Sequence, residues 1–129
     1  MIATLKDWGT STQIFKTPYV EVLLLHINED KESSLHHHDH KHSLIKVITG
    51  RVSFYYSDPR RPKSFNMQEL DERSATATIP AGVIHGFKAV TKSVVLEIYH
   101  SPDVNPEDIV TDFATISDHN RQRSSFHSI

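Results

Sequence analysis

The sequence predicts an all-β fold, a sandwich or barrel, built as a single domain. Short runs of β-branched and aromatic residues recur along the chain, and turn-forming residues close each of them. Helical periodicity is nearly absent before residue 105. A chain of 129 residues can bury one hydrophobic core but not two. We therefore expect one domain over residues 1–116, followed by a polar, frayed tail over residues 117–129.

The first half of the chain contains three expected strands. Residues 19–27 and 43–49 are rich in Val, Ile and Leu, and Gly50 allows a tight bend into a third strand over residues 51–56. Residues 57–64 carry two prolines and three cations, so we expect a loop there.

The second half contains four more expected strands, followed by a segment that is expected to form a helix or an edge strand. These strands cover residues 65–70, 75–79, 83–90 and 93–100. Asn105 can cap a helix and Pro106 suits its first turn, which predicts a short helix over residues 106–114. Residues 109–113 (IVTDF) favour β-structure, so an edge strand is the alternative.

Charge and composition argue against several classes of partner. Fourteen Lys and Arg against sixteen Asp and Glu leave a net charge of −2, so we expect no nucleic acid and no membrane as partner. The absence of cysteine excludes disulfides and thiolate metal ligands. No apolar run approaches the roughly 18 residues of a spanning helix, and residues 1–10 lack the apolar segment of a signal peptide, so we expect a cytoplasmic protein.

The number of histidines is unusually high for a chain of this length. Five of the ten histidines fall within residues 36–42, between two expected strands. His36 and His38 are alternate residues of an extended segment, so their imidazoles face the same side. His85 follows a rigid turn made by Pro, Ala and Gly at residues 80–82. Neutral imidazole binds divalent transition metals, and these three histidines therefore form a candidate metal site.

The two histidine segments resemble the two signature motifs of the cupins. His36, His38 and Gly50 match the first motif, G-x5-H-x-H-x3–4-E-x6-G, and residues 80–85 (PAGVIH) match the centre of the second, G-x5-P-x-G-x2-H-x3-N. The resemblance covers about residues 20–112. It implies a cupin-type double-stranded β-helix, or jelly-roll barrel, with a short C-terminal helix or strand. It also implies a bound divalent transition metal such as zinc, iron, nickel or manganese.

Three positions depart from the cupin motifs, where Ser43 replaces the metal-binding glutamate, Ser74 the leading glycine of the second motif and Ala89 its final asparagine. Three neutral histidines leave the double charge of an ion uncompensated and a coordination position open for water or an anionic ligand. His42, directly before the vacant glutamate position, is the preferred source of a fourth nitrogen. His40 is another source, and it also forms a rival H-x-H pair with His38.

Short elements along the chain are similar to sugar-directed cupins, namely the C-terminal domain of bifunctional phosphomannose isomerases and the cupin domain of sialic acid synthases. The matching elements are Trp8-Gly9, Ser34-Leu35, residues 36–42, residues 96–98 (LEI) and residues 107–110 (EDIV). This resemblance implies a small-molecule ligand, a sugar or sugar phosphate, and isomerase- or epimerase-like chemistry. Glu97 is then the candidate acid or base. Tyr99 is the second candidate catalytic residue.

A second similarity is to the iron-dependent thiol dioxygenases such as cysteine dioxygenase, which use three histidines and no glutamate. Residues 33–38 match their S-S-x-H-x-H motif, and Ser43 and Tyr99 stand where some members carry a cysteine cross-linked to tyrosine. Glu97 stands where a histidine belongs, and the substrate-binding arginine has no match in residues 10–35. A cupin that binds a ligand without catalysis is the third possibility.

Cupins commonly pair through an edge strand or an exchanged N-terminal segment. The strand expected over residues 19–27 is too hydrophobic to lie at an exposed edge. We therefore expect a homodimer.

Overall fold

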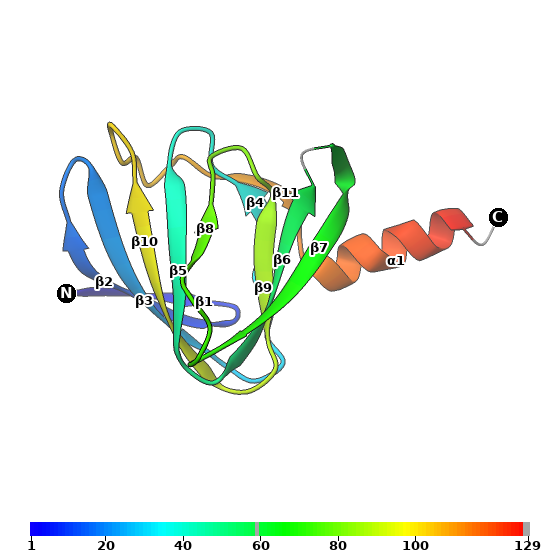
Figure 1. Cartoon of the computed structure of the whole chain (residues 1–129), viewed down its shortest axis with the longest axis horizontal. Helices are drawn as coiled ribbons and strands as arrows, with labels where there is room; N and C mark the ends of the chain where they lie inside the picture. Colours follow the sequence, from blue (N-terminus) through cyan, green and yellow to red (C-terminus); the bar gives the residue numbers. More distant parts are fainter. Residues whose placement is uncertain (59, 128–129) are drawn as a thin grey trace.

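The computed structural model describes residues 1–58 and 60–127, and it consists of two antiparallel sheets that face each other, followed by one helix (Figure 1). The six-stranded sheet contains, in spatial order, β1 (Ile2–Lys6), β2 (Gly9–Lys16), β3 (Val20–Ile27), β10 (Ser93–His100), β5 (His42–Thr49) and β8 (Ala77–Ile79). The five-stranded sheet contains β11 (Val110–Phe113), β4 (Leu35–His37), β9 (His85–Ala89), β6 (Arg51–Asp58) and β7 (Arg61–Asp71). Helix α1 (Ile116–His127) extends away from the sheets (Figure 1). Within the described residues, no helix is long and apolar enough to cross a membrane.

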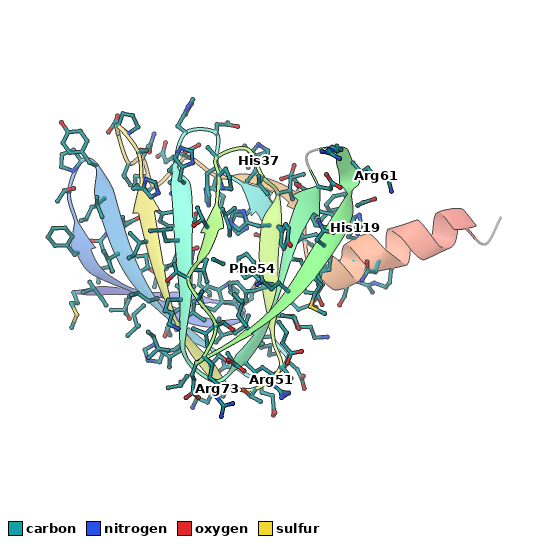
Figure 2. The ribbon with its side chains drawn as sticks, in the orientation of Figure 1. His37, Arg51, Phe54, Arg61, Arg73 and His119 are labelled. Atoms are coloured by element: carbon teal, nitrogen blue, oxygen red, sulfur yellow. The ribbon has the colours of Figure 1, made fainter. Side chains whose placement is uncertain are left out.

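The strands form because alternate residues point between the sheets, where they are buried. Along β5 the buried residues are Ser43, Ile45 and Val47, and the residues between them are half-buried. The apolar core lies toward the end of the barrel that is closed by the β5–β6 and β9–β10 turns. Its buried members are Leu25, Ile27, Ile45, Val47, Val52, Phe54, Leu70, Ile79, Ala89 and Val95. Figure 2 shows Phe54 in the middle of the barrel, between His37 at one end and Arg51 and Arg73 at the other.

Gly50 makes the turn between β5 and β6 possible. Its φ of 91° lies in the region that favours glycine. A Cβ at this position would also lie 2.3 Å from the Ser93 hydroxyl oxygen. The bend predicted at Gly50 is therefore confirmed.

The seven predicted strands are confirmed and correspond to β3, β5, β6, β7, β8, β9 and β10. The prediction of a loop over residues 57–64 is wrong. Strand β6 continues to Asp58, and β7 begins at Arg61. Because β7 lies at the edge of its sheet, one side of its backbone needs no partner, and proline is tolerated there.

The helix predicted over residues 106–114 is also wrong. The Asn105 side chain accepts a hydrogen bond from the Glu107 N–H at 2.9 Å, which closes a turn and starts no helix. The β-branched residues that follow form β11, the alternative of an edge strand, because β4 offers them a free edge. Helix α1 instead takes up residues 116–127, most of the segment that we expected to be frayed, and residues 128–129 lie outside the described part.

The N-terminal hairpin of β1 and β2 was not predicted, and it changes the argument about association. It covers one side of β3, while β10 covers the other, so β3 is not an edge strand. The expected homodimer therefore loses the reason given for it. Large apolar side chains are exposed on the hairpin instead, among them Ile2, Leu5 and Phe15.

Candidate metal centre

Three of the predicted ligands, His36, His38 and His85, come together between the sheets. His36 in β4 lies directly opposite His85 in β9, and His38 follows β4 on the same face as His36. One ring nitrogen from each residue lies within 4.8 Å of the corresponding nitrogen of the other two. The ring centroids are 4.5–5.3 Å apart.

Backbone carbonyls set the tautomer of all three rings. The Nδ1 atoms of His36, His38 and His85 lie 3.0, 2.6 and 2.9 Å from the carbonyl oxygens of Ser34, Asp108 and Val83. A carbonyl can only accept a hydrogen bond, so each Nδ1 carries the proton and donates it. In the neutral ring, the lone pair is then on Nε2. This is the arrangement that prepares a histidine to bind a metal.

The same histidines are held in the neutral form. Burial lowers the pKa of His85 to about 3 and that of His38 to about 4, and it also lowers the pKa of His36. At neutral pH a metal ion therefore has no proton to displace from these rings.

The donors present fit a divalent transition metal ion. The Nε2 atoms of His38 and His85 are buried and have no hydrogen-bond partner among the described residues. A buried polar atom left without a partner costs about 1–3 kcal/mol, and a metal ion would supply the missing partner. Three imidazoles also match the ligand preference of zinc, iron and nickel.

Asp108 holds the histidine loop in place, and the sequence analysis missed this role. Its carboxylate accepts hydrogen bonds from the backbone N–H groups of Asp39, His40 and Lys41 at 2.8–3.1 Å, and its carbonyl oxygen accepts one from the His38 Nδ1–H. Partial burial alone would raise the pKa of Asp108, but these N–H groups lower it below its ordinary value. No local signal identified this residue, because 70 positions separate it from His38.

The structure does not bring the other candidate ligands to the cluster. His42 points away from it: the His42 Nδ1 accepts the Ala81 N–H at 3.0 Å, and the ring stacks on His100 with centroids 5.2 Å apart. His40 is exposed, so the rival pair of His38 and His40 is not formed. Among the described residues, the metal-ligand cluster contains only the three histidines.

Glu97 and Tyr99, the candidate catalytic residues, lie on β10 and face the interior beside the histidines. The Tyr99 ring contacts the His38 ring edge-on, with centroids 5.0 Å apart. Burial raises the pKa of Glu97 to about 7, although the Tyr99 hydroxyl donates a hydrogen bond to this carboxylate and opposes the shift. Both residues line a pocket of about 340 Å³ together with His36 and His85. This pocket can hold a small molecule next to the histidines.

Ser43 occupies the position of the absent glutamate and faces the interior, as the first cupin motif implies. It is 1% exposed, and its hydroxyl oxygen has no partner among the described residues. Across the sheet it lies directly opposite Tyr99.

No protein-family model and no curated protein matches the chain. Solved structures match most of it at low identity. The capsular polysaccharide assembling protein CapF from Staphylococcus aureus matches with a TM-score of 0.73 and 16% identity, over 85% of this chain and 33% of its own. Oxalate decarboxylase from Bacillus subtilis matches with a TM-score of 0.73 and 13% identity, over 86% of this chain and 30% of its own. KdgF from Halomonas sp. matches with a TM-score of 0.67 and 14% identity, over 81% of this chain and 90% of its own.

These matching proteins share the cupin fold. The chain spans about a third of the length of CapF and of oxalate decarboxylase. Because these structures match more than 80% of this chain, the chain has the cupin fold, the jelly-roll barrel that its two motifs predicted. Within that fold, the site is a cluster of three neutral histidines suited to a divalent ion.

Proposed function

We propose that this protein is a mononuclear metal-binding cupin that binds a small sugar or sugar derivative and moves a proton on it, as an isomerase or epimerase does. The observation that carries the proposal is the convergence of three histidines, each with Nδ1 tied to a carbonyl and Nε2 free to bind. Glu97, in the same pocket, supports the choice of proton transfer.

The chemistry follows from the protonation states in the pocket. A divalent ion held by His36, His38 and His85 would polarise a carbonyl or hydroxyl oxygen of the ligand. With a pKa of about 7, Glu97 is present in both protonation states at neutral pH. It can therefore take a proton from one carbon of the ligand and return it to another. Tyr99 holds the carboxylate in place through its hydroxyl group.

The metal-binding part of the proposal is tested by elemental analysis and calorimetry on protein without a histidine tag. We expect close to one zinc, iron, nickel or manganese ion per chain. Substituting Ala for His36, His38 or His85 should weaken binding by more than the ~10–100-fold typical of outer-shell partners. His40→Ala, in the same loop, is the matched control and should bind as the parent does. A parent protein that holds no metal after loading would refute the proposal.

The proton-transfer part is tested by incubating metal-loaded protein with a panel of aldoses and ketoses in deuterated water. Deuterium should enter a carbon-bound position of one of these sugars, and Glu97→Gln should abolish this exchange while keeping the metal. A protein that binds metal and sugar but catalyses no exchange would be a ligand-binding cupin without catalysis.

A thiol-type dioxygenase is the second candidate, favoured by the three-histidine set and by Ser43 opposite Tyr99. The isomerase reaction needs no oxygen, whereas a dioxygenase needs Fe(II) and is inert with zinc, which has no redox chemistry. Oxygen-electrode measurements on the Fe(II)-loaded protein with cysteine distinguish the two. We expect no uptake, because residues 10–35 contain no arginine to anchor the substrate. Rapid uptake would reverse the ranking.

We also propose that the protein forms a homodimer through the N-terminal hairpin. Ile2 and Leu5 of β1 are 67% and 86% exposed, and a second copy would remove them from water. Sedimentation at micromolar concentration should show twice the 14.7 kDa mass of the chain. Leu5→Lys should shift the population toward the monomer, and a parent protein that is monomeric would contradict the proposal.

A further inference from the structure

Lys41 is a buried cation beside the histidine cluster that the proposed function does not use. It is 4% exposed and lines a pocket of about 290 Å³ together with His38, Glu21, Gln13 and Tyr99. Tyr99 also lines the larger pocket next to the histidines, so the two pockets adjoin. A ligand that fills both would contact the cluster at one end and Lys41 at the other.

The charge on Lys41 has little compensation from the protein. Its Nζ lies 4.1 Å from the centroid of the Tyr99 ring and a long 3.5 Å from the Asn105 carbonyl oxygen. None of the ion pairs found among the described residues includes Lys41. Buried charges in proteins are normally paired, and an interaction with one aromatic face replaces only part of the lost hydration.

The nearby carboxylates already have other partners. Glu21 accepts a hydrogen bond from the Gln13 side-chain amide at 2.8 Å, and Glu97 accepts one from the Tyr99 hydroxyl. Asp108 is occupied as well, because its carboxylate accepts the backbone N–H groups of Asp39, His40 and Lys41. Burial dominates and lowers the pKa of the Lys41 ammonium group, although Glu21, Asp108 and Glu97 all attract it from a distance. The three histidines are neutral, so they add no negative charge. The pocket therefore has a positive position that an anionic group from outside can occupy.

We propose that Lys41 binds the carboxylate of an acidic ligand whose hydroxyl or carbonyl oxygens face the three-histidine cluster. This inference rests on the proposed metal-binding function and narrows its ligand to a hydroxylated carboxylic acid. A carboxylate carries one negative charge, which matches the one buried ammonium group of this pocket. Lys6 also lines the pocket, but it is exposed, so water and salt screen its charge. A phosphate dianion in the same place would lie close to Glu21 and Glu97 and be repelled by both.

The test compares three ligands of similar size by calorimetry on metal-loaded protein: gluconate, its uncharged counterpart glucitol, and glucose 6-phosphate. Lys41→Met keeps the length of the side chain and removes its charge. It should weaken gluconate binding by about 10- to 100-fold, the range for a lost hydrogen bond to a charged group, and leave glucitol binding unchanged. Lys92→Met, which removes an exposed lysine in the β9–β10 turn, is the matched control and should leave the affinity for all three ligands unchanged.

Two further variants keep the test decisive. Lys41→Arg keeps the positive charge and should retain most of the gluconate affinity, and Lys41→Gln gives a second uncharged variant in case Lys41→Met does not fold. Because Lys41 lacks a protein counter-ion, Lys41→Met should melt at the same temperature as the parent or higher. A markedly lower melting temperature would identify Lys41 as a structural residue and overturn the proposal.

The remaining outcomes also decide the question. Equal gluconate affinity in the parent and in Lys41→Met, or no saturable gluconate binding by the metal-loaded parent, would overturn the proposal. Tighter binding of glucose 6-phosphate than of gluconate would overturn the choice of a carboxylate. Metal content is measured first on the parent and on Lys41→Met. A metal-free parent refutes the proposed function, whereas metal-loaded proteins that fail the ligand comparison refute only the inference about Lys41.

Discussion

The two ends of the barrel are built on the same strands but bury different chemistry. From the end at the Gly50 turn toward the histidines, the buried residues are Val47, Ile45 and Ser43 on β5, and Ser93, Val95, Glu97 and Tyr99 on β10. Toward the histidines, Val47 and Ile45 of β5 are followed by Ser43, and Val95 of β10 is followed by Glu97 and Tyr99. Ser93 at the Gly50 turn is polar too, but its hydroxyl donates to the backbone carbonyls of Arg51 and Thr91.

The apolar end stabilises the folded protein, whereas the polar end lowers its stability. Four buried side-chain atoms of the described residues lack a hydrogen-bond partner, and three of them lie at the polar end: His38 Nε2, His85 Nε2 and the Ser43 hydroxyl. Each of these costs about 1–3 kcal/mol, while the apolar end contributes through burial. The apolar end thus offsets the cost of a binding site that is incomplete without its ligand.

Metal binding should have the largest effect on this balance. At a free metal concentration of about 1,000 times Kd, stabilisation should reach about 4 kcal/mol, which raises the melting temperature by on the order of 10 °C. Differential scanning fluorimetry with and without zinc measures this shift. His85→Ala should lose it, and an equal shift in His85→Ala would place the bound ion elsewhere.

Neighbouring inward positions of β5 should respond in opposite ways to alanine. Ile45→Ala leaves a cavity in the core and should lower the free energy of unfolding by about 3 kcal/mol. Ser43→Ala removes a buried hydroxyl that has no partner, so stability should be unchanged or rise by up to about 1 kcal/mol. Urea denaturation of the metal-free proteins gives both values. A substantial loss in Ser43→Ala would mean that its hydroxyl has a stabilising partner.

Acid should destabilise the metal-free protein through the polar end. The pKa values of His38 and His85 are about 4 and 3 in the folded protein, against an ordinary value of 6.5. Below pH 6.5 the unfolded chain therefore binds more protons, and each histidine lowers stability by about 1.4 kcal/mol per pH unit until its folded pKa is reached. Glu97 acts in the opposite direction between pH 7 and 4.5, because its folded pKa of about 7 lies above its ordinary value of 4.5.

The loss of stability should therefore be shallow between pH 6.5 and 4.5 and steepest between pH 4.5 and 4, where His38 and His85 both act and Glu97 no longer opposes them. Urea denaturation at a series of pH values would measure this profile. Glu97→Gln removes the opposing group and should steepen the loss above pH 4.5. Identical pH profiles for Glu97→Gln and the parent would show that the carboxyl does not retain its proton in this range.

Restoring a carboxylate at position 43 should have the smallest effect. Ser43→Glu points between the sheets and adds an oxygen ligand that favours Mn(II), so binding should tighten by about tenfold by calorimetry. His42→Glu is the matched control, since His42 points away from the cluster and should change Mn(II) affinity little. Equal effects at the two positions would mean that the bound ion does not lie on the inward face of β5.

Much of the barrel and the three-histidine set could be predicted because they depend on local patterns. Alternation along an extended segment puts His36 and His38 on one face whatever lies around them. The turn at residues 80–82 gives His85 its place at the start of β9. Gly82 donates its N–H to the His38 carbonyl oxygen at 2.8 Å, so this turn also ties the two motifs together.

The rest depended on contacts between distant parts of the chain. Residues 110–113 became a strand because β4 presented a free edge, which outweighed the capping signal at Asn105. Asp108 and Lys41 acquired their roles only when the loop before β11 met the histidine loop. The pKa of Glu97 rises because the barrel closes around it, and burial cannot be read from an L-E-I triplet. Periodicity and turn chemistry are properties of neighbouring residues, whereas strand pairing and desolvation arise only when the sheets come together.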